Sequence, residues 1–184
     1  FRPRSIASSP SSSISCAPYA SEASSCSSRI LRRTARSSRV AVMAFFFANA
    51  EIQIEGGAGW ATSLPTWRIE NSIWLDIFWG GRAMTGYHAW VFTFMALVFF
   101  SPLAFNGRWT WRNVGLAVAG LIVFWVCEDF LWFIINPAFG WARFNPVDAF
   151  WHKHWLWGAP VDYWGGLAVA LLIRMPLEEM AMHV

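Results

Sequence analysis

The feature that most constrains this chain is the apolar stretch from Asn113 to Pro137, NVGLAVAGLIVFWVCEDFLWFIINP. A helix needs about 20 apolar residues to cross a bilayer, and this stretch is long enough. Two adjacent acids, Glu128 and Asp129, lie inside it. A carboxylate near the middle of a bilayer costs about 2.5–3.5 kcal/mol, so such acids usually face a protein interior or a water-filled cavity. The pair therefore marks a candidate site.

The rest of the composition agrees with a membrane setting. Apolar residues make up 56% of the chain and charged residues only 14%, which lies on the membrane side of the soluble range. All 14 Trp follow residue 59, and Trp is enriched where a membrane meets water. We expect an all-α polytopic membrane protein, folded as a single helical domain over residues 43–184.

Three apolar segments predict membrane-spanning helices, at about residues 86–105, 113–136 and 160–175. The turn at Asn106-Gly107 separates the first two segments. The third segment is short, and Pro176 is expected to end it. Lys and Arg are divided between the two ends of these segments, so they do not set the membrane orientation.

Residues 51–83 mix acids, Gly and Trp too closely to cross a bilayer, so we place them at the membrane surface. Within them, Ile73, Trp74, Ile77 and Phe78 recur at helical spacing. This spacing predicts a short amphipathic helix that lies flat on the membrane and ends at Gly80-Gly81.

Residues 1–42 contain 14 Ser and seven Arg but only one acid, a composition that cannot bury a core. Three explanations stay open. The segment is upstream sequence before a true start at Met43, or an organelle transit peptide, or a secretory signal with a cleavage site at residues 48–50. The first and second explanations predict a bacterial inner membrane and an organelle membrane, respectively.

The net charge of +3 comes from this segment alone, because residues 43–184 hold seven Lys or Arg against ten Asp or Glu. Its Arg alternate with Ser rather than with aromatic residues, and no nucleic-acid-binding motif follows. We therefore expect no nucleic-acid partner. Cys16, Cys26 and Cys127 form no paired motif, so the sequence predicts neither a disulfide framework nor a zinc site built on cysteines.

With three spans, the topology brings most polar residues of interest to one side of the membrane. The candidate catalytic residues on that side are His88, Glu128, Asp129, His152 and His154. Asn136, together with Asp148 or Asp162, could join them. Because adjacent helical residues point about 100° apart, we expect only one of Glu128 and Asp129 to belong to the site.

Several chemistries fit such a group. Glu128, His152 and His154 are the candidate metal ligands, since imidazole and carboxylate bind zinc, iron and manganese. A His hydrogen-bonded to a carboxylate also serves proton transfer. The alternative is structural, with a buried acid that pairs with Arg143 or caps backbone amides, and with histidines that anchor a loop at the membrane surface.

Aromatic residues surround the two acids. Trp125, Phe130, Trp132 and Phe133 could line a site for a flat apolar ligand such as a quinone, a carotenoid or a tetrapyrrole. At helical spacing, such residues more often face lipid or pack against other helices.

Four stretches resemble a family of small, uncharacterised bacterial integral membrane proteins. They are EIQIEGGAGWATSLPTWR, GGRAMTGYH, EDFLWFIINPAFGWARFNP and WHKHWLWGAPVDYW, and the resemblance covers about residues 51–164. It implies a helical membrane protein and carries no assigned reaction, so no catalytic residue follows from it.

The sequence thus predicts a small multi-pass membrane protein that acts as an accessory subunit or binds an apolar ligand or a partner helix. The alternative is a membrane-embedded enzyme that uses the His and carboxylate residues, with or without a metal, on a lipid-soluble substrate. The expected partners are the lipid bilayer and either membrane helices or an apolar ligand.

Overall fold

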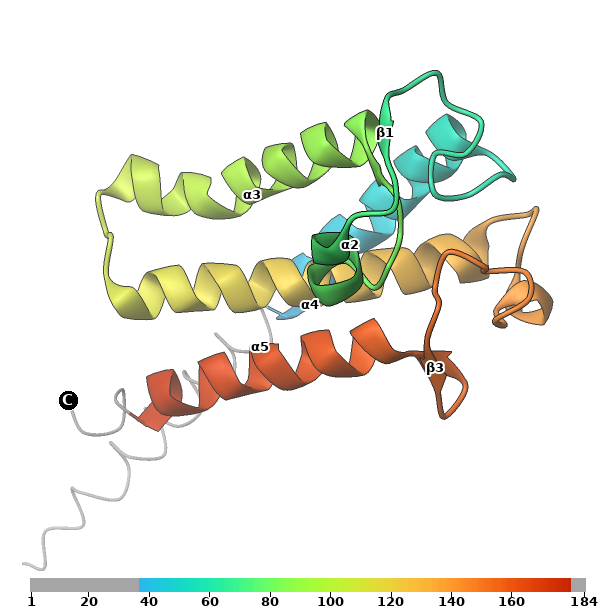
Figure 1. Ribbon diagram of the computed structural model, residues 1–184. Coiled ribbons are helices and arrows are strands. Elements are labelled where there is room, and N and C mark those ends of the chain that lie inside the picture. Colours follow the sequence, from blue (N-terminus) through green and yellow to red (C-terminus); the bar gives the residue numbers. More distant parts are fainter. Residues whose placement is uncertain (1–36, 180–184) are drawn as a thin grey trace, which may run out of the picture. The chain divides into compact units, whose positions relative to one another are not determined.

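The computed structural model describes residues 37–179, except for the side chains of residues 77, 78, 176, 178 and 179. From Arg39 onward, the described chain belongs to one compact unit. The three explanations for residues 1–42 concern a segment that lies largely outside the described residues. The described chain is mainly helical, which confirms the all-α class (Figure 1).

A helix over residues 37–55 opens the described chain, and α2, α3, α4 and α5 follow with short strands between them. The labelled elements are β1 (Arg68–Ile69), α2 (Ile73–Phe78), β2 (Met84–Thr85), α3 (Gly86–Asn106), α4 (Trp111–Ile135), the single 3-10 turn η1 (Trp141–Arg143), β3 (Trp155–Leu156), β4 (Ala159–Pro160) and α5 (Val161–Glu179).

Helices α3 and α4 form an antiparallel pair whose ends are set by local hydrogen bonds (Figure 1). The Thr85 side chain accepts a hydrogen bond from the His88 N–H and begins α3, and Thr110 caps α4 in the same way. Gly107 ends α3 in the left-handed conformation, with φ of 62°, which glycine adopts without strain. The tight turn between the two caps returns the chain alongside α3.

Both helices of this pair are long and apolar enough to cross a membrane, judged by length and composition. The core helix of a soluble protein would be mostly buried, whereas only 17% of the apolar window of α3 and 28% of that of α4 are buried. The first two predicted spans are therefore confirmed as apolar helices, with ends within two residues of those expected.

Helix α5 packs along α4 through glycines. A Cβ on Gly166 would lie 3.2 Å from Val126 Cγ2, so the absent side chain lets the two helices approach closely. The expectation that Pro176 ends this segment is wrong, since α5 continues to Glu179. Among the described helices, α3 and α4 alone meet the length and apolarity of a span, so the third span stays a prediction.

The helix over residues 37–55 was not predicted from the sequence, which assigned residues 51–55 to the membrane surface. Ala44 and Ala48 on this helix are fully buried, and their small side chains allow close packing. Phe47 makes an edge contact with Phe124 of α4, at 5.6 Å between ring centroids. Residues 51–55 therefore belong to a packed helix. Its contact surface is a face of small Ala side chains rather than a continuous apolar run.

The loops over residues 56–85 and 136–160 cover one end of the helices, at the right of Figure 1. Each contains a two-stranded antiparallel ladder, β1 with β2 and β3 with β4. The predicted short helix is confirmed as α2, followed by Gly80 and Gly81 with φ of 62° and 75°. On α2, Ile73 is exposed and Leu75 is buried, and the side chains of residues 77 and 78 lie outside the described part.

Candidate functional site

A cavity of about 450 Å³ lies between the helices, and its volume is typical of a site for a small organic ligand. Residues from the 37–55 helix, α3, α4, α5 and both loops line it. Its walls include Leu121 and Ile122, which precede the end of α4 by roughly four helical turns. The cavity therefore extends from the loop-covered end towards the middle of the helices.

Aromatic side chains form a large part of the cavity wall. Phe92 of α3 packs its ring against Trp125 of α4 and against Trp79, with centroids 4.3 and 4.9 Å apart. The other aromatic lining residues are Trp60, Trp132, Trp151 and Tyr163. Of the aromatic residues around the acids that the sequence suggested, Trp125 and Trp132 line the cavity, whereas Phe130 and Phe133 are not among its lining residues.

Four charged side chains form one group at the polar end of the cavity. His152 lies between two carboxylates, with Nε2 3.1 Å from Asp129 Oδ2 and Nδ1 3.4 Å from Asp162 Oδ2. Arg82 donates to the same Asp162 oxygen, and its guanidinium carbon lies 4.8 Å from the Trp60 ring centroid. With His152 protonated, the two cations balance the two carboxylates.

The surroundings of His152 favour its charged form. Burial alone would lower the pKa of the imidazole, but the Asp129 carboxylate and its contact with His152 raise it. Asp162 also raises this pKa, whereas Arg82 lowers it. The net effect is a pKa above the ordinary value. Tyr163 also donates its hydroxyl to Asp129, which completes this charge-balanced group.

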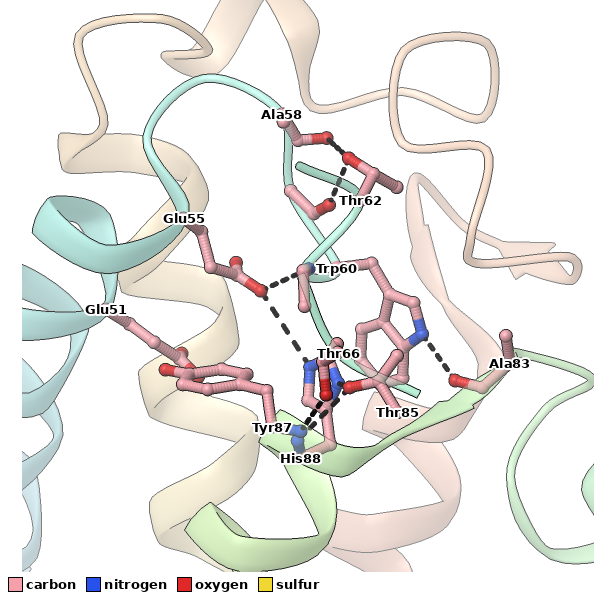
Figure 2. A network of polar contacts seen from close by, with 12 residues as sticks. Glu51, Glu55, Ala58, Trp60, Thr62, Thr66, Ala83, Thr85, Tyr87 and His88 are labelled. Atoms are coloured by element: carbon pink, nitrogen blue, oxygen red, sulfur yellow. Dashed lines mark hydrogen bonds and ion pairs between the residues drawn. The ribbon is translucent and has the colours of Figure 1, made fainter. Parts of the chain in front are cut away.

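Three glutamates form a second group, which we call the carboxyl cluster: Glu51, Glu55 and Glu128. They are 7%, 6% and 2% exposed. The Tyr87 hydroxyl donates to Glu51 at 3.0 Å, and the Ala61 N–H donates to Glu55. Figure 2 shows Glu51 and Glu55 on the 37–55 helix, beside Tyr87 and His88. The Oε1 atom of Glu128 has no hydrogen-bond partner.

The surroundings of Glu51 and Glu55 favour the protonated form of their carboxyl groups. Burial raises the pKa of the Glu55 carboxyl to about 8, the neighbouring Glu51 carboxylate acts in the same direction, and the Ala61 N–H opposes both. Burial also raises the pKa of Glu51, although its contacts with Glu128 and Tyr87 work against this. Because two carboxylates only accept hydrogen bonds, the contact between Glu51 and Glu128 requires a proton on one of them.

His88 is held in place by its neighbours. Its Nδ1 atom lies 2.7 Å from Thr85 Oγ1, and its ring stacks on Trp60 with centroids 3.9 Å apart. The Trp60 indole in turn donates to the Ala83 carbonyl oxygen at 2.7 Å. His88 Nε2 lies 3.9 Å from Glu55 Oε1, so this residue connects the first turn of α3 to the carboxyl cluster (Figure 2).

Of the predicted catalytic residues, His88, Glu128 and Asp129 line the cavity, and His152 contacts Asp129 from the loop. The expectation that only one of Glu128 and Asp129 belongs to the site is wrong. Their side chains do point about 100° apart on α4, but other elements that line the cavity lie in both of these directions. Glu128 meets Glu51 of the 37–55 helix, whereas Asp129 meets His152 and Tyr163.

The remaining predicted residues lie elsewhere. His154 is exposed and is not among the residues that line the cavity. Within residues 37–179, no group of three or more His, Cys, Asp and Glu side chains is placed to hold a metal ion, including the predicted set of Glu128, His152 and His154. Arg143 pairs with Asp148 at 2.9 Å rather than with a buried acid.

Asn136 has a structural role at the end of α4. Its side-chain amide donates to the Gly56 carbonyl oxygen at 2.9 Å, and its side-chain oxygen accepts from the Ala138 N–H. These bonds join the end of α4 to the end of the 37–55 helix, and they position Glu55 and Glu128 at the same end of the structure.

Sequence reasoning missed Glu51, Glu55, Arg82 and Tyr163 as site residues. The signal for the first two was present, since Ala44, Ala48, Glu51 and Glu55 recur at a spacing of three or four residues and share one helical face. No sequence pattern pointed to Arg82, because its partner Asp162 lies far from it in the sequence.

Comparison with known proteins gives no further assignment, because no family model, no curated protein and no solved structure matches this chain. The resemblance to small bacterial membrane proteins stays a prediction.

Proposed function

We propose that this chain is a multi-pass membrane protein that binds a small, lipid-soluble ligand with a polar end in the cavity between its helices. The membrane setting is supported by apolar side chains that α3 exposes along one face. Trp90, Phe94 and Leu97 are all largely exposed, at the spacing of a helical stripe. In water, such a stripe would be costly, whereas lipid chains cover it well.

The observation that carries the ligand proposal is the combination of an aromatic cavity with buried polar atoms that lack partners. Oε1 of Glu128 and Nε1 of both Trp79 and Trp132 have no hydrogen-bond partner, and all three residues line the cavity. A buried polar group without a partner costs about 1–3 kcal/mol, and native structures contain few. A ligand with a polar end would satisfy these atoms while its apolar body fills the deeper part near Leu121 and Ile122.

The test is to fill the cavity. Val126→Phe places a larger side chain in the lining, and Leu97→Phe introduces the same aromatic side chain on an exposed face of α3. Both variants and the wild type are purified in one detergent, and bound small molecules are extracted and compared by mass spectrometry. We expect the wild type and Leu97→Phe to retain the same compound, and Val126→Phe to retain at least roughly tenfold less of it.

Gel filtration and circular dichroism establish that the Val126→Phe protein is folded. The proposal fails if the wild type carries no small molecule, or if a folded Val126→Phe protein retains as much of it as the wild type.

One observation favours an enzyme as a second candidate function. His152 lies between Asp129 and Asp162, and Tyr163 contacts Asp129, an arrangement suited to proton transfer at the edge of the cavity. An enzyme would convert the compound extracted from the cavity when that compound is added back to purified protein. Tyr163→Phe would slow the conversion at least roughly tenfold, and a wild type that leaves the compound unchanged would contradict this candidate.

A further inference from the structure

The acidic side chains on one side of the cavity are paired with Arg82 and His152, whereas the carboxyl cluster on the other side has no such partner. Arg82 and His152 are paired with Asp162 and Asp129. Among the ion pairs of the described residues, none joins a Lys or Arg to Glu51, Glu55 or Glu128. The His88 imidazole contacts the cluster, with Nε2 3.9 Å from Glu55 Oε1. Within the described part of the chain, the carboxyl cluster therefore lacks a Lys or Arg partner, and an ammonium group that binds there would displace protons that burial holds on Glu51 and Glu55.

The groups that face this cluster come from every neighbouring element. Asp129 of α4 adds negative charge, and Tyr87 and His88 of α3 are close by. Arg68 acts on Glu55 from a distance, because its guanidinium is hydrogen-bonded to the Ala61 carbonyl oxygen. Arg68 is thus already engaged with the backbone.

Glu128 supplies an independent indication of a ligand. It is 2% exposed, it lines the cavity, and its Oε1 atom has no partner. The protein sequesters a carboxyl oxygen at the wall of a cavity without providing a donor for it. The missing donor must come from whatever occupies the cavity, and a positively charged donor forms the stronger bond.

The aromatic wall fits the same kind of ligand. Trp125 and Trp132 line the cavity together with the carboxyl cluster. The faces of aromatic rings attract cations, so these rings would add to the binding of an ammonium group. The described His, Cys, Asp and Glu side chains form no group arranged to ligate a metal ion, so the site suits an organic cation better than a metal ion.

We propose that the ligand of this cavity is a hydrophobic amine, whose ammonium group binds between Glu51, Glu55 and Glu128 and whose apolar body lies against the Trp and Phe side chains. This inference rests on the proposed function and specifies its ligand class. The indole N–H groups of Trp79 and Trp132 are then left for an oxygen atom of the ligand or for water.

The test compares three probes of the same shape: phenylbutylamine, phenylbutanol and phenylbutanoic acid. Binding to the full chain in lipid nanodiscs is measured at pH 7 by tryptophan fluorescence and by the shift in melting temperature. We expect the wild type to bind the amine at least about tenfold more tightly than the alcohol, and the acid most weakly.

Glu128→Gln keeps the size of the side chain and prevents it from ionising to form an ion pair with the ammonium group. We expect it to abolish most of the preference for the amine, about a tenfold loss, and to leave alcohol binding unchanged. Glu70→Gln, at an exposed residue outside the cavity lining, is the matched control and should keep the full preference. If the Glu128→Gln protein does not fold, Glu51→Gln decides the question in the same way.

The outcomes separate this inference from the function on which it rests. A wild type that binds the alcohol or the acid as tightly as the amine overturns the amine proposal alone. A preference for the amine that persists in the folded glutamate variants also overturns it. If none of the three probes binds and Val126→Phe behaves as the wild type, the proposed function fails together with the inference.

Discussion

At the scale of single residues, Glu55 shows how the cavity makes folding depend on pH. Its carboxyl group is buried beside Glu51, and the Ala61 N–H donates to it. Burial raises its pKa from the ordinary 4.5 to about 8, with help from the Glu51 carboxylate and against the weaker effect of Arg68. Between these two values, the folded protein holds a proton that the unfolded chain releases, so the stability of the folded state falls as pH rises.

The expected loss of unfolding free energy between pH 4.5 and 8 is about 4 kcal/mol for this group, at roughly 1.4 kcal/mol per pKa unit. Below pH 4.5, the carboxyl is protonated in both states and costs nothing. Glu55→Gln removes the ionisation and keeps an oxygen for the Ala61 N–H, so we expect a flatter dependence of stability on pH.

Melting temperature, measured in one detergent across this pH range, checks the prediction. Glu70→Gln serves as the control, since Glu70 is exposed and should leave the wild-type slope unchanged. An identical slope in the Glu55→Gln and wild-type proteins would show that the group ionises alike in the folded and unfolded states.

At the scale of elements, the helix over residues 37–55 determines whether the carboxyl cluster exists, since it carries Glu51 and Glu55. Its packing depends on two fully buried alanines, Ala44 and Ala48. Ala48 belongs to the same core cluster as Trp132 and Phe133 of α4. A well-packed contact of this kind has no room for added methylene groups.

Ala48→Leu should therefore destabilise the protein by about 1–3 kcal/mol through overpacking. Phe46→Leu, on the exposed side of the same helix, should change stability by less than about 0.5 kcal/mol. Reversible unfolding in mixed micelles gives both values. Equal effects of the two substitutions would contradict the packing described for this helix.

The two long helices of the antiparallel pair could be predicted from an apolar run, and the short helix α2 from the helical spacing of its apolar residues. For α3 and α4, hydropathy and a tight turn were sufficient, because a span must be apolar over its whole length. The 37–55 helix was not predicted because its buried face consists of small alanines followed by two acids, and only the neighbouring helices explain why acids lie there. For the same reason, His88, Glu128, Asp129 and His152 were placed at one end by topology, while Glu51 and Glu55 were missed.

At the scale of the whole molecule, the loops over residues 56–85 and 136–160 lie at one end of the helices, and the turn from Gly107 to Thr110 lies at the other (Figure 1). If α3 and α4 cross a membrane, these two regions lie on opposite sides of it. Val147 and Arg108 are exposed residues in the two regions and provide positions for labelling.

We expect Val147→Cys and Arg108→Cys to react with a membrane-impermeant thiol reagent from opposite sides of sealed vesicles. The experiment uses a background in which Cys16, Cys26 and Cys127 are replaced by Ser, and permeabilised vesicles supply the control for total reactivity. Reaction of both positions from the same side would contradict a crossing by α3 and α4.

The cavity wall also has a consequence for how the protein is made. Its lining begins with Glu51 on the first described helix and ends with Gly166 on α5. During synthesis, α4 and the loop that carries His152 are therefore made before α5 supplies Asp162 and Tyr163. Until then, His152 lacks its second carboxylate and Asp129 lacks the hydroxyl that donates to it, so the charge-balanced group is complete only when the last described helix docks.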